Sequence, residues 1–86
     1  MVPEEGSSVK ELVEEIAKAL VDKPEEIQVT ERVLPGEGGT VFALRVAADD
    51  VGRVIGKQGR TARSIRSLLL AAGSKTNHRY TLEIAE

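Results

Sequence analysis

The sequence contains no cysteine and no tryptophan, and its aromatic residues are Phe42, Tyr80 and the single histidine, His78. The lack of cysteine excludes disulfides, Cys-based zinc sites and thiol nucleophiles, and one histidine cannot build a His-rich metal site. No apolar run approaches the ~20 residues that cross a bilayer, and the N-terminus lacks the basic and apolar regions of a signal peptide. We therefore expect a cytoplasmic protein with no cofactor and no membrane role.

Charge nearly cancels over the chain but is unevenly distributed along it. The 86 residues, enough for one domain, carry 12 basic and 14 acidic side chains, a net charge of −2. Residues 1–31 hold three basic and nine acidic residues (net −6), whereas residues 32–86 hold nine and five (net +4). Between Val51 and Leu82 there is no acidic residue, and seven basic residues lie there: Arg53, Lys57, Arg60, Arg63, Arg66, Lys75 and Arg79. This asymmetry indicates a side that faces a polyanion.

The first part of the chain predicts an amphipathic helix. Ser8 and Glu11 form an S-x-x-E capping box at its start, so we expect residues 1–7 to be a flexible N-terminus and residues 8–86 a single domain. The helix should bury the apolar residues that recur at spacings of three and four, which are Val9, Leu12, Val13, Ile16, Ala17 and Leu20.

Two further helices are predicted in the second half. Asp49 or Asp50 offers an N-cap for a short helix that ends at Ile55, and a longer helix covers 60–72, with Gly73 at its C-terminal end. The residues of the longer helix that should face inward are Ala62, Ile65, Leu68, Leu69 and Ala72.

Three segments read as strands because β-branched or alternating apolar residues dominate them. They cover 27–34, 40–47 and 78–85, and the sequence PGEGG at 35–39 predicts the hairpin turn. Phe42 and Tyr80 alternate with polar neighbours and are expected in the core. The order α-β-β-α-α-β predicts an α+β fold, a three-stranded sheet with three helices packed on one face.

The informative motif is G-K-Q-G at residues 56–59, between the two later helices. Two glycines let the backbone turn sharply and leave its amides uncovered by β-carbons, so that a sugar-phosphate chain can approach closely. The N-terminus of the following helix points at the same place and favours anions. Lys57, Arg60 and Arg63 add positive charge beside it.

This motif in this element order resembles the KH domain, whose GXXG loop clamps four nucleotides. The order of elements matches the type II form. The run from Asp49 to Thr61, DDVGRVIGKQGRT, and the following Ile65-Arg66 are similar to the small single-domain bacterial KH proteins of the KhpA type. The resemblance covers 8–86, nearly the whole chain.

The resemblance implies that single-stranded RNA, or less often DNA, lies in a narrow groove beside the loop. Gly56 and Gly59 would hold the nucleic-acid backbone, and the other implied contacts are an apolar floor at Gly52, Val54 and Ile55, phosphate contacts at Lys57, Gln58 and Arg60, and rim contacts at Arg53 and Arg63. The family also implies a role in post-transcriptional regulation or as an RNA chaperone, homodimers, and pairing with a KhpB (Jag/EloR)-type KH partner.

Other interpretations fit the residues less well. Residues 52–58 differ from a P-loop because three residues, not four, separate the glycines and because Gln58 stands where Ser or Thr must hold magnesium. No catalytic motif emerges, so no enzyme activity is expected. The rival function is a protein-interaction module with little RNA binding of its own. Leu70, which lies furthest from the inward stripe of its helix, is a candidate dimer contact.

Overall fold

The computed structural model describes residues 5–36, 38–74 and 77–85. Residues 1–4 of the predicted N-terminal segment, Glu37 of the predicted turn, the basic residue Lys75 and the C-terminal Glu86 lie outside the described residues. The elements run in the predicted order: α1 (Glu5–Leu20), β1 (Gln28–Leu34), β2 (Gly39–Arg45), α2 (Val51–Ile55), α3 (Arg60–Ser74) and β3 (Arg79–Ala85). Single turns of 3-10 helix precede β1, α2 and α3, at Pro24–Glu26, Ala48–Asp50 and Lys57–Gly59.

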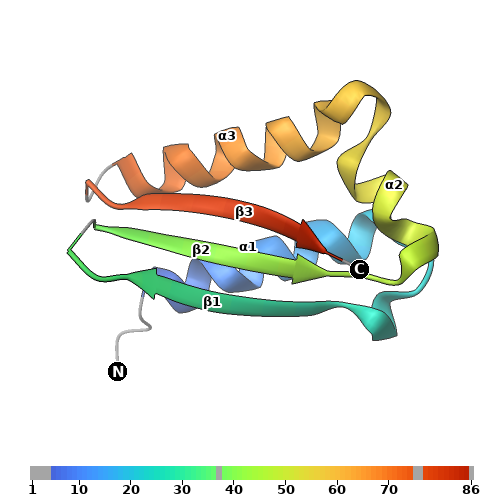
Figure 1. The fold of residues 1–86 in the computed structure, drawn as a ribbon, viewed down its shortest axis with the longest axis horizontal. Coiled ribbons are helices and arrows are strands. Elements are labelled where there is room, and N and C mark those ends of the chain that lie inside the picture. Colours follow the sequence, from blue (N-terminus) through green and yellow to red (C-terminus); the bar gives the residue numbers. More distant parts are fainter. Residues whose placement is uncertain (1–4, 37, 75–76, 86) are drawn as a thin grey trace.

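The three strands form one mixed sheet in the order β1-β2-β3. β1 and β2 are an antiparallel hairpin in which Thr30 faces Ala43, and β2 and β3 are parallel with Phe42 beside Leu82. Parallel neighbours need a crossover connection, and α2, the G-K-Q-G loop and α3 supply it. The crossover carries the loop to the end of the sheet where β2 and β3 finish (Figure 1).

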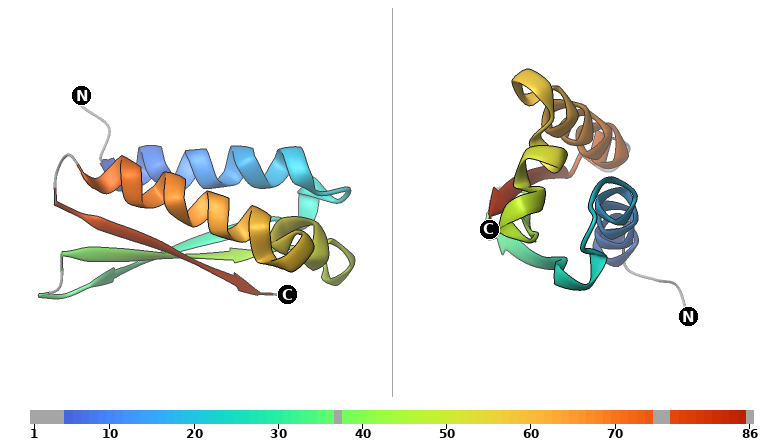
Figure 2. Two further views of the ribbon diagram at one scale, coloured as in Figure 1. Left: turned by 90° about the horizontal axis from the view of Figure 1, so that it is seen from above. Right: turned by 90° about the vertical axis from the view of Figure 1, so that its right-hand side faces the viewer.

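The helices α1 and α3 lie on one face of the sheet, and α2 lies at its end (Figure 2). This confirms the predicted α+β architecture, and its order of elements is that of a type II KH fold. No helix in the described part of the chain is long and apolar enough to span a membrane.

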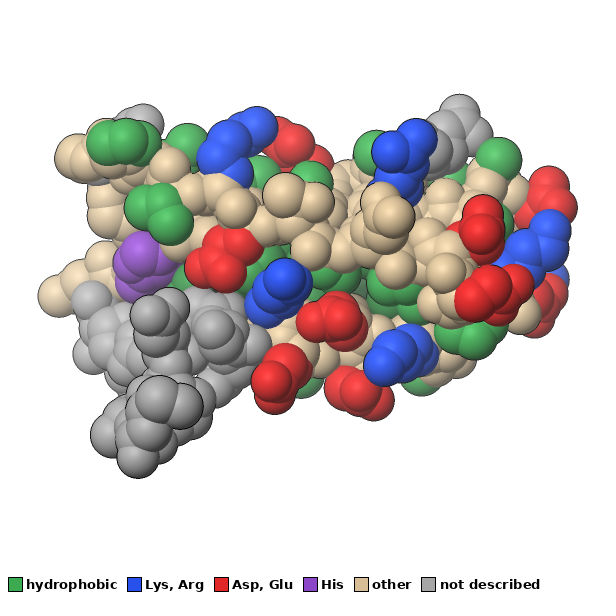
Figure 3. Space-filling model, turned by 90° about the horizontal axis from the view of Figure 1, so that it is seen from below, with side chains coloured by type: hydrophobic (Ala, Val, Ile, Leu, Met, Phe, Trp, Pro, Cys, Tyr) green, Lys and Arg blue, Asp and Glu red, His purple; other side chains and the backbone are tan. Residues whose placement is uncertain are grey.

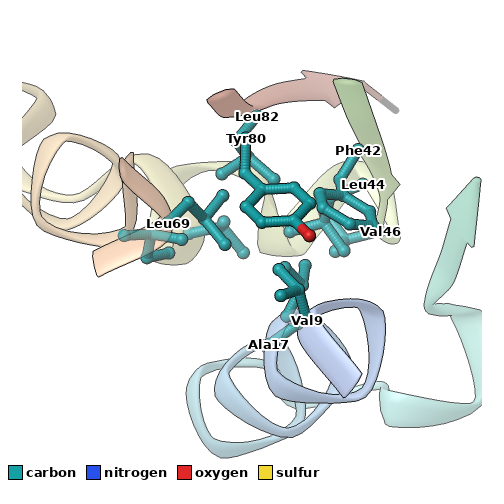
Figure 4. Close-up of a cluster of buried hydrophobic side chains, with 11 residues drawn as sticks. Val9, Ala17, Phe42, Leu44, Val46, Leu69, Tyr80 and Leu82 are labelled. Atoms are coloured by element: carbon teal, nitrogen blue, oxygen red, sulfur yellow. The ribbon is translucent and has the colours of Figure 1, made fainter. Parts of the chain in front are cut away.

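The core lies between the sheet and the helices and is almost entirely aliphatic. It combines Val9, Val13 and Ala17 of α1, Phe42 and Leu44 of β2, Val46, Val54 of α2, Ile65 and Leu69 of α3, and Tyr80 and Leu82 of β3. Figure 4 shows the rings of Phe42 and Tyr80 side by side in this cluster, and their centroids are 5.6 Å apart. The prediction that both aromatic residues belong to the core is confirmed.

Three local predictions about helix ends need correction. α1 begins at Glu5, so Ser8 lies within the helix and not at the N-cap position. Asp50 stands at the N-cap position of α2, as predicted, but its side chain makes no capping hydrogen bond. Its carboxylate instead accepts hydrogen bonds from Asp22 and Lys23. Gly73 does not end α3, which continues to Ser74.

The predicted helix faces also need correction. Leu68 of α3 is 54% exposed and Leu12 of α1 is 41% exposed, although both were expected to face inward. Ala72 is exposed as well, and the buried position next to it is Gly73. A β-carbon at Gly73 would overlap the carbonyl oxygen of His78, so the end of α3 lies against the backbone that enters β3. Close backbone packing of this kind has no hydrophobic signature in the sequence.

Candidate nucleic-acid interface

The loop between α2 and α3 depends on glycine at its first position. Gly56 has φ 78° and ψ 171°, a conformation that is essentially restricted to glycine. A β-carbon there would also overlap the Thr61 side chain and lie 2.8 Å from the Thr61 backbone nitrogen. The chain therefore turns out of α2 and into α3 within a space that admits no side chain at Gly56.

The rest of the loop is a single 3-10 turn with two further left-handed residues. Gln58 has φ 58° and ψ 26°, and Gly59 has φ 73°. Lys57 and Gln58 are exposed, and α3 begins directly after the turn at Arg60. The positive end of the α3 dipole is consequently adjacent to the loop and favours a negative charge there.

Two arginines of α3 reach back onto this turn. Arg63 Nη2 donates to the Gln58 carbonyl oxygen over 3.1 Å, and Arg60 Nη2 donates to Gln58 Oε1 over 3.3 Å. Among the described residues, neither arginine nor Lys57 forms an ion pair with an acidic side chain. Within the described part of the chain, three positive charges therefore lie at the loop without an acidic partner, and Arg and Lys side chains are common phosphate contacts.

Arg53 is placed differently from these three residues. Its Nη2 lies 2.8 Å from Asp22 Oδ2 and its Nε lies 3.3 Å from Asp50 Oδ1. The charge of Arg53 is thus compensated by carboxylates of the same chain. The structure does not bring Arg53 into the group formed by Lys57, Arg60 and Arg63, and its role as an RNA contact stays a prediction.

The residues expected to form an apolar floor divide into surface and core. Gly52 is exposed, and a β-carbon there would meet nothing within 4 Å. Ile55 is 37% exposed, so Gly52 and Ile55 present a small apolar surface before the loop. Val54 is 0% exposed, and its side chain can therefore support such a floor only from beneath.

Arg66 was not among the predicted site residues, although it follows Arg63 by one turn. Its Nε donates to the Leu82 carbonyl oxygen of β3 over 3.3 Å. β3 is an edge strand, and α3 runs alongside it (Figure 1). The spacing of Arg63 and Arg66 was visible in the sequence, but the contact with β3 depends on how the helix packs.

Another face of the molecule carries charges of both signs. On the face shown in Figure 3, acidic and basic side chains lie side by side, unlike the wholly basic run from Val51 to Leu82. Near the turn after α1, Lys23 Nζ donates to Asp49 Oδ2 over 3.2 Å. This hydrogen bond, together with the charge of Asp49, raises the pKa of the Lys23 ammonium above its ordinary value. Lys23 and Asp49 thus compensate each other's charge, unlike the three basic residues at the loop.

Comparison with known proteins gives a consistent result over most of the chain. The family described as "KhpA/KhpB, KH domain" matches residues 10–84. A Treponema pallidum protein named "RNA-binding protein KhpA" is 52% identical over 77 residues, which cover 90% of this chain and 94% of that protein. The proteins of the same name from Clostridium acetobutylicum and Aquifex aeolicus are 50% identical over 76 residues and 48% identical over 80 residues. These alignments cover 88% and 93% of this chain, and 99% of each relative. No solved structure matches the chain.

Proposed function

Because the chain belongs to the KH-domain family of KhpA and KhpB, we propose that it is a non-enzymatic protein that binds single-stranded RNA. The observation that carries the proposal is the exposed turn at Lys57 and Gln58, beside which Lys57, Arg60 and Arg63 have no acidic partner among the described residues. The names of the relatives support RNA as the ligand. The proposal places the protein in the bacterial cytoplasm, where such RNA is found.

In this proposal the loop clamps the backbone of about four nucleotides. Lys57 and Arg60 meet phosphate oxygens, Gln58 adds polar contacts, and Arg63 lies at the rim. Gly56 fixes the direction of the turn, and Gly59, where a β-carbon would meet only Arg63 Nη2 at 4.0 Å, leaves room for the sugar-phosphate chain beside the loop. The bases then lie toward the surface that Gly52 and Ile55 present, supported from beneath by Val54.

The site has no exposed Phe, Tyr or Trp for base stacking, because the chain's only Phe and Tyr, Phe42 and Tyr80, are buried in the core and it has no Trp. Stacking on aromatic side chains contributes ~1–3 kcal/mol per base in other single-strand binders, and this contribution is absent here. A single copy should therefore bind weakly and with loose sequence preference, for single-stranded DNA as well as RNA. Useful affinity would come from several linked copies, either a homodimer or a pair with a KhpB-type protein, as expected of a post-transcriptional regulator or RNA chaperone.

A second candidate function is a protein-interaction module. The observation that favours it is the exposure of two leucines on α3, Leu68 at 54% and Leu70 at 49%. In that case the fold would act as a subunit of a homodimer or heterodimer, and its own affinity for RNA would be negligible even at low salt.

The double variant Lys57→Asp/Gln58→Asp tests the proposal. Two carboxylates at the loop should repel phosphate, so binding of a fluorescently labelled single-stranded RNA should be lost while the circular dichroism spectrum is unchanged. The matched control is Lys10→Asp/Gln28→Asp, which makes the same change of net charge on α1 and β1 and should retain most of the affinity. Undiminished binding by the folded loop variant would contradict the clamp. No binding by the wild-type protein at low salt would favour the interaction module.

The salt dependence of binding gives an independent check. Contacts with about three phosphates predict that log K falls with log salt at a slope of about −2, because each contact with a single strand contributes about −0.7. The single variant Lys57→Ala should reduce the magnitude of the slope by about 0.7. A flat dependence in the wild-type protein would rule out a phosphate clamp.

A further inference from the structure

Asp50 is a buried carboxylate that serves a segment distant from it in the sequence. It is 1% exposed and ends the 3-10 turn that leads into α2. Its Oδ1 accepts the backbone N–H of Asp22 over 3.2 Å, and its Oδ2 accepts the backbone N–H of Lys23 over 3.0 Å. The carboxylate thus satisfies two donors in the turn that follows α1, 27 and 28 residues away.

Arg53 of α2 forms ion pairs with both of these segments. It pairs with Asp50 and with the Asp22 side chain, at 3.3 Å and 2.8 Å. Asp22 therefore contributes its backbone N–H to Asp50 and its carboxylate to Arg53. We call the group formed by Asp22, Lys23, Asp50 and Arg53 the Asp50 bracket.

The bracket holds a helix that is too short to be stable by itself. α2 has five residues, far fewer than the ~12–15 that an isolated helix needs, so tertiary contacts must fix its direction. Val54 anchors it in the core, and the bracket ties its first turn to the end of α1. Gly56 follows α2 directly, and its N–H donates to Gly52 over 2.9 Å. The direction of α2 therefore determines where the loop at Gly56–Gly59 points.

From these contacts we propose that Asp50 and Arg53 are positioning residues for the RNA-binding loop, and that Arg53 acts through α2 and not by contacting phosphate. The inference rests on the proposed function, because the loop is the RNA contact. It also assigns a role to the turn after α1, since a displacement of residues 21–23 would release α2 and loosen the loop. Breaking the bracket should weaken binding even in protein that remains fully folded.

The test uses three variants of the full chain, Asp50→Asn, Arg53→Gln and Asp22→Asn. The exposed ion pair between Arg32 and Glu83 on the sheet, 3.4 Å long, supplies matched controls. Arg32→Gln makes the same charge change as Arg53→Gln, and Glu83→Gln removes one carboxylate as Asp22→Asn does. RNA affinity and its salt slope are measured at a temperature where circular dichroism shows every variant to be folded.

We expect the bracket variants to bind RNA about three- to tenfold more weakly than their controls. The salt slope of Arg53→Gln should equal that of Arg32→Gln, because no phosphate contact is lost. An affinity equal to that of the control would show that the bracket stabilises the fold without positioning the loop. A slope reduced by about 0.7 would identify Arg53 as a phosphate contact. Either result would overturn the proposal.

Amide hydrogen exchange provides a readout that needs no RNA. The N–H groups of Gly56 and Gly59 donate to Gly52 and Gly56 over 2.9 and 3.1 Å, so their exchange reports on the loop. Exchange at both should accelerate in Asp22→Asn and Asp50→Asn more than at core amides such as that of Leu44. If exchange accelerated equally at all amides, or did not accelerate at the loop, the proposed positioning role of the bracket would be contradicted. This measurement therefore distinguishes a failure of the positioning proposal from a failure of the wild-type protein to bind RNA. Asp22→Asn, on an exposed side chain, keeps the test available if Asp50→Asn does not fold.

Discussion

Gly52 and Gly73 both lie in helices, but their surroundings are opposite. A β-carbon at Gly52 would project into open space, whereas one at Gly73 would overlap the His78 carbonyl oxygen. His78 N–H also donates to the Gly73 carbonyl over 2.9 Å, which fixes the end of α3 against the start of β3. Glycine is therefore required for packing at Gly73 but not at Gly52, and only the neighbouring atoms in the fold show this difference.

We predict that Gly73→Ala destabilises the protein, because α3 must move away from β3 to admit the methyl group. Overpacking of this kind costs about 1–3 kcal/mol in the free energy of unfolding, which urea denaturation measures. Gly52→Ala is the matched control and should be neutral or stabilising by up to ~1 kcal/mol, because alanine favours a helix over glycine. Equal effects of the two substitutions would contradict the close packing at Gly73.

Single residues also show the limit of reading a site from its sequence. Val54 is predicted to form part of the apolar floor, and its fully buried side chain could do so only from beneath the surface. Asp50 was expected to cap its own helix, but its carboxylate accepts the N–H groups of Asp22 and Lys23. The residue types at these positions were informative, yet their partners come from segments whose proximity the sequence does not reveal.

At the scale of elements, the loop between α2 and α3 is defined by its backbone. Its first glycine combines a left-handed φ with close contact to Thr61. Gly36 in the hairpin turn has nearly the same φ, 77°, but a β-carbon there would meet nothing within 4 Å. The two glycines therefore share a positive φ but differ in the space that a β-carbon would find.

We predict that Gly56→Ala is more damaging than Gly36→Ala. An alanine held at positive φ costs about 1–3 kcal/mol, and the overlap with Thr61 should add about 1–3 kcal/mol at Gly56 alone. Thermal unfolding of the two variants measures the difference. RNA affinity of the folded protein should fall for Gly56→Ala and stay unchanged for Gly36→Ala. Similar stabilities for both variants would show that Thr61 gives way easily.

Most elements could be predicted from the sequence because their signals are local. Helical spacing of apolar residues located α1 and α3, and alternation located β3, to within a few residues at each end. The G-K-Q-G loop was located because glycine pairs interrupt helices. The buried face of a helix was predicted less well. Leu68 fits the apolar stripe of α3 by its spacing but is exposed, because the position of neighbouring elements decides which side of the helix is covered.

At the scale of the whole molecule, the two exposed leucines of α3 bear on oligomerisation. Leu68 and Leu70 are two residues apart and therefore about 200° apart around the helix. Leu70 follows Arg66 by four residues and shares its flank of α3, beside β3. A dimer formed through Leu70 would use the flank of α3 that carries Arg63 and Arg66, whereas one formed through Leu68 would use the opposite flank.

We predict that the protein is a dimer and that Leu70→Glu shifts it to monomer, because a carboxylate cannot be buried in an apolar contact without a large cost. Sedimentation equilibrium at several concentrations measures the change, and Leu68→Glu is the matched control. Loss of the dimer with Leu68→Glu alone would assign the contact to the other flank of α3. A wild-type monomer at high concentration would contradict the prediction altogether.

The net charge of −2 is a sum over two differently charged parts of the chain. The sequence by itself determined this division, the order of elements and the position of the loop, because each depends on residues that are close together in the chain. The tertiary structure decided which charges are free. Arg53 is neutralised by Asp22 and Asp50, while Lys57, Arg60 and Arg63 have no acidic partner in the described part of the chain. Ion pairs such as that between Arg53 and Asp22 join residues that are far apart in the chain. The sequence therefore gives the number of charges, but only the folded structure shows which of them lack a partner.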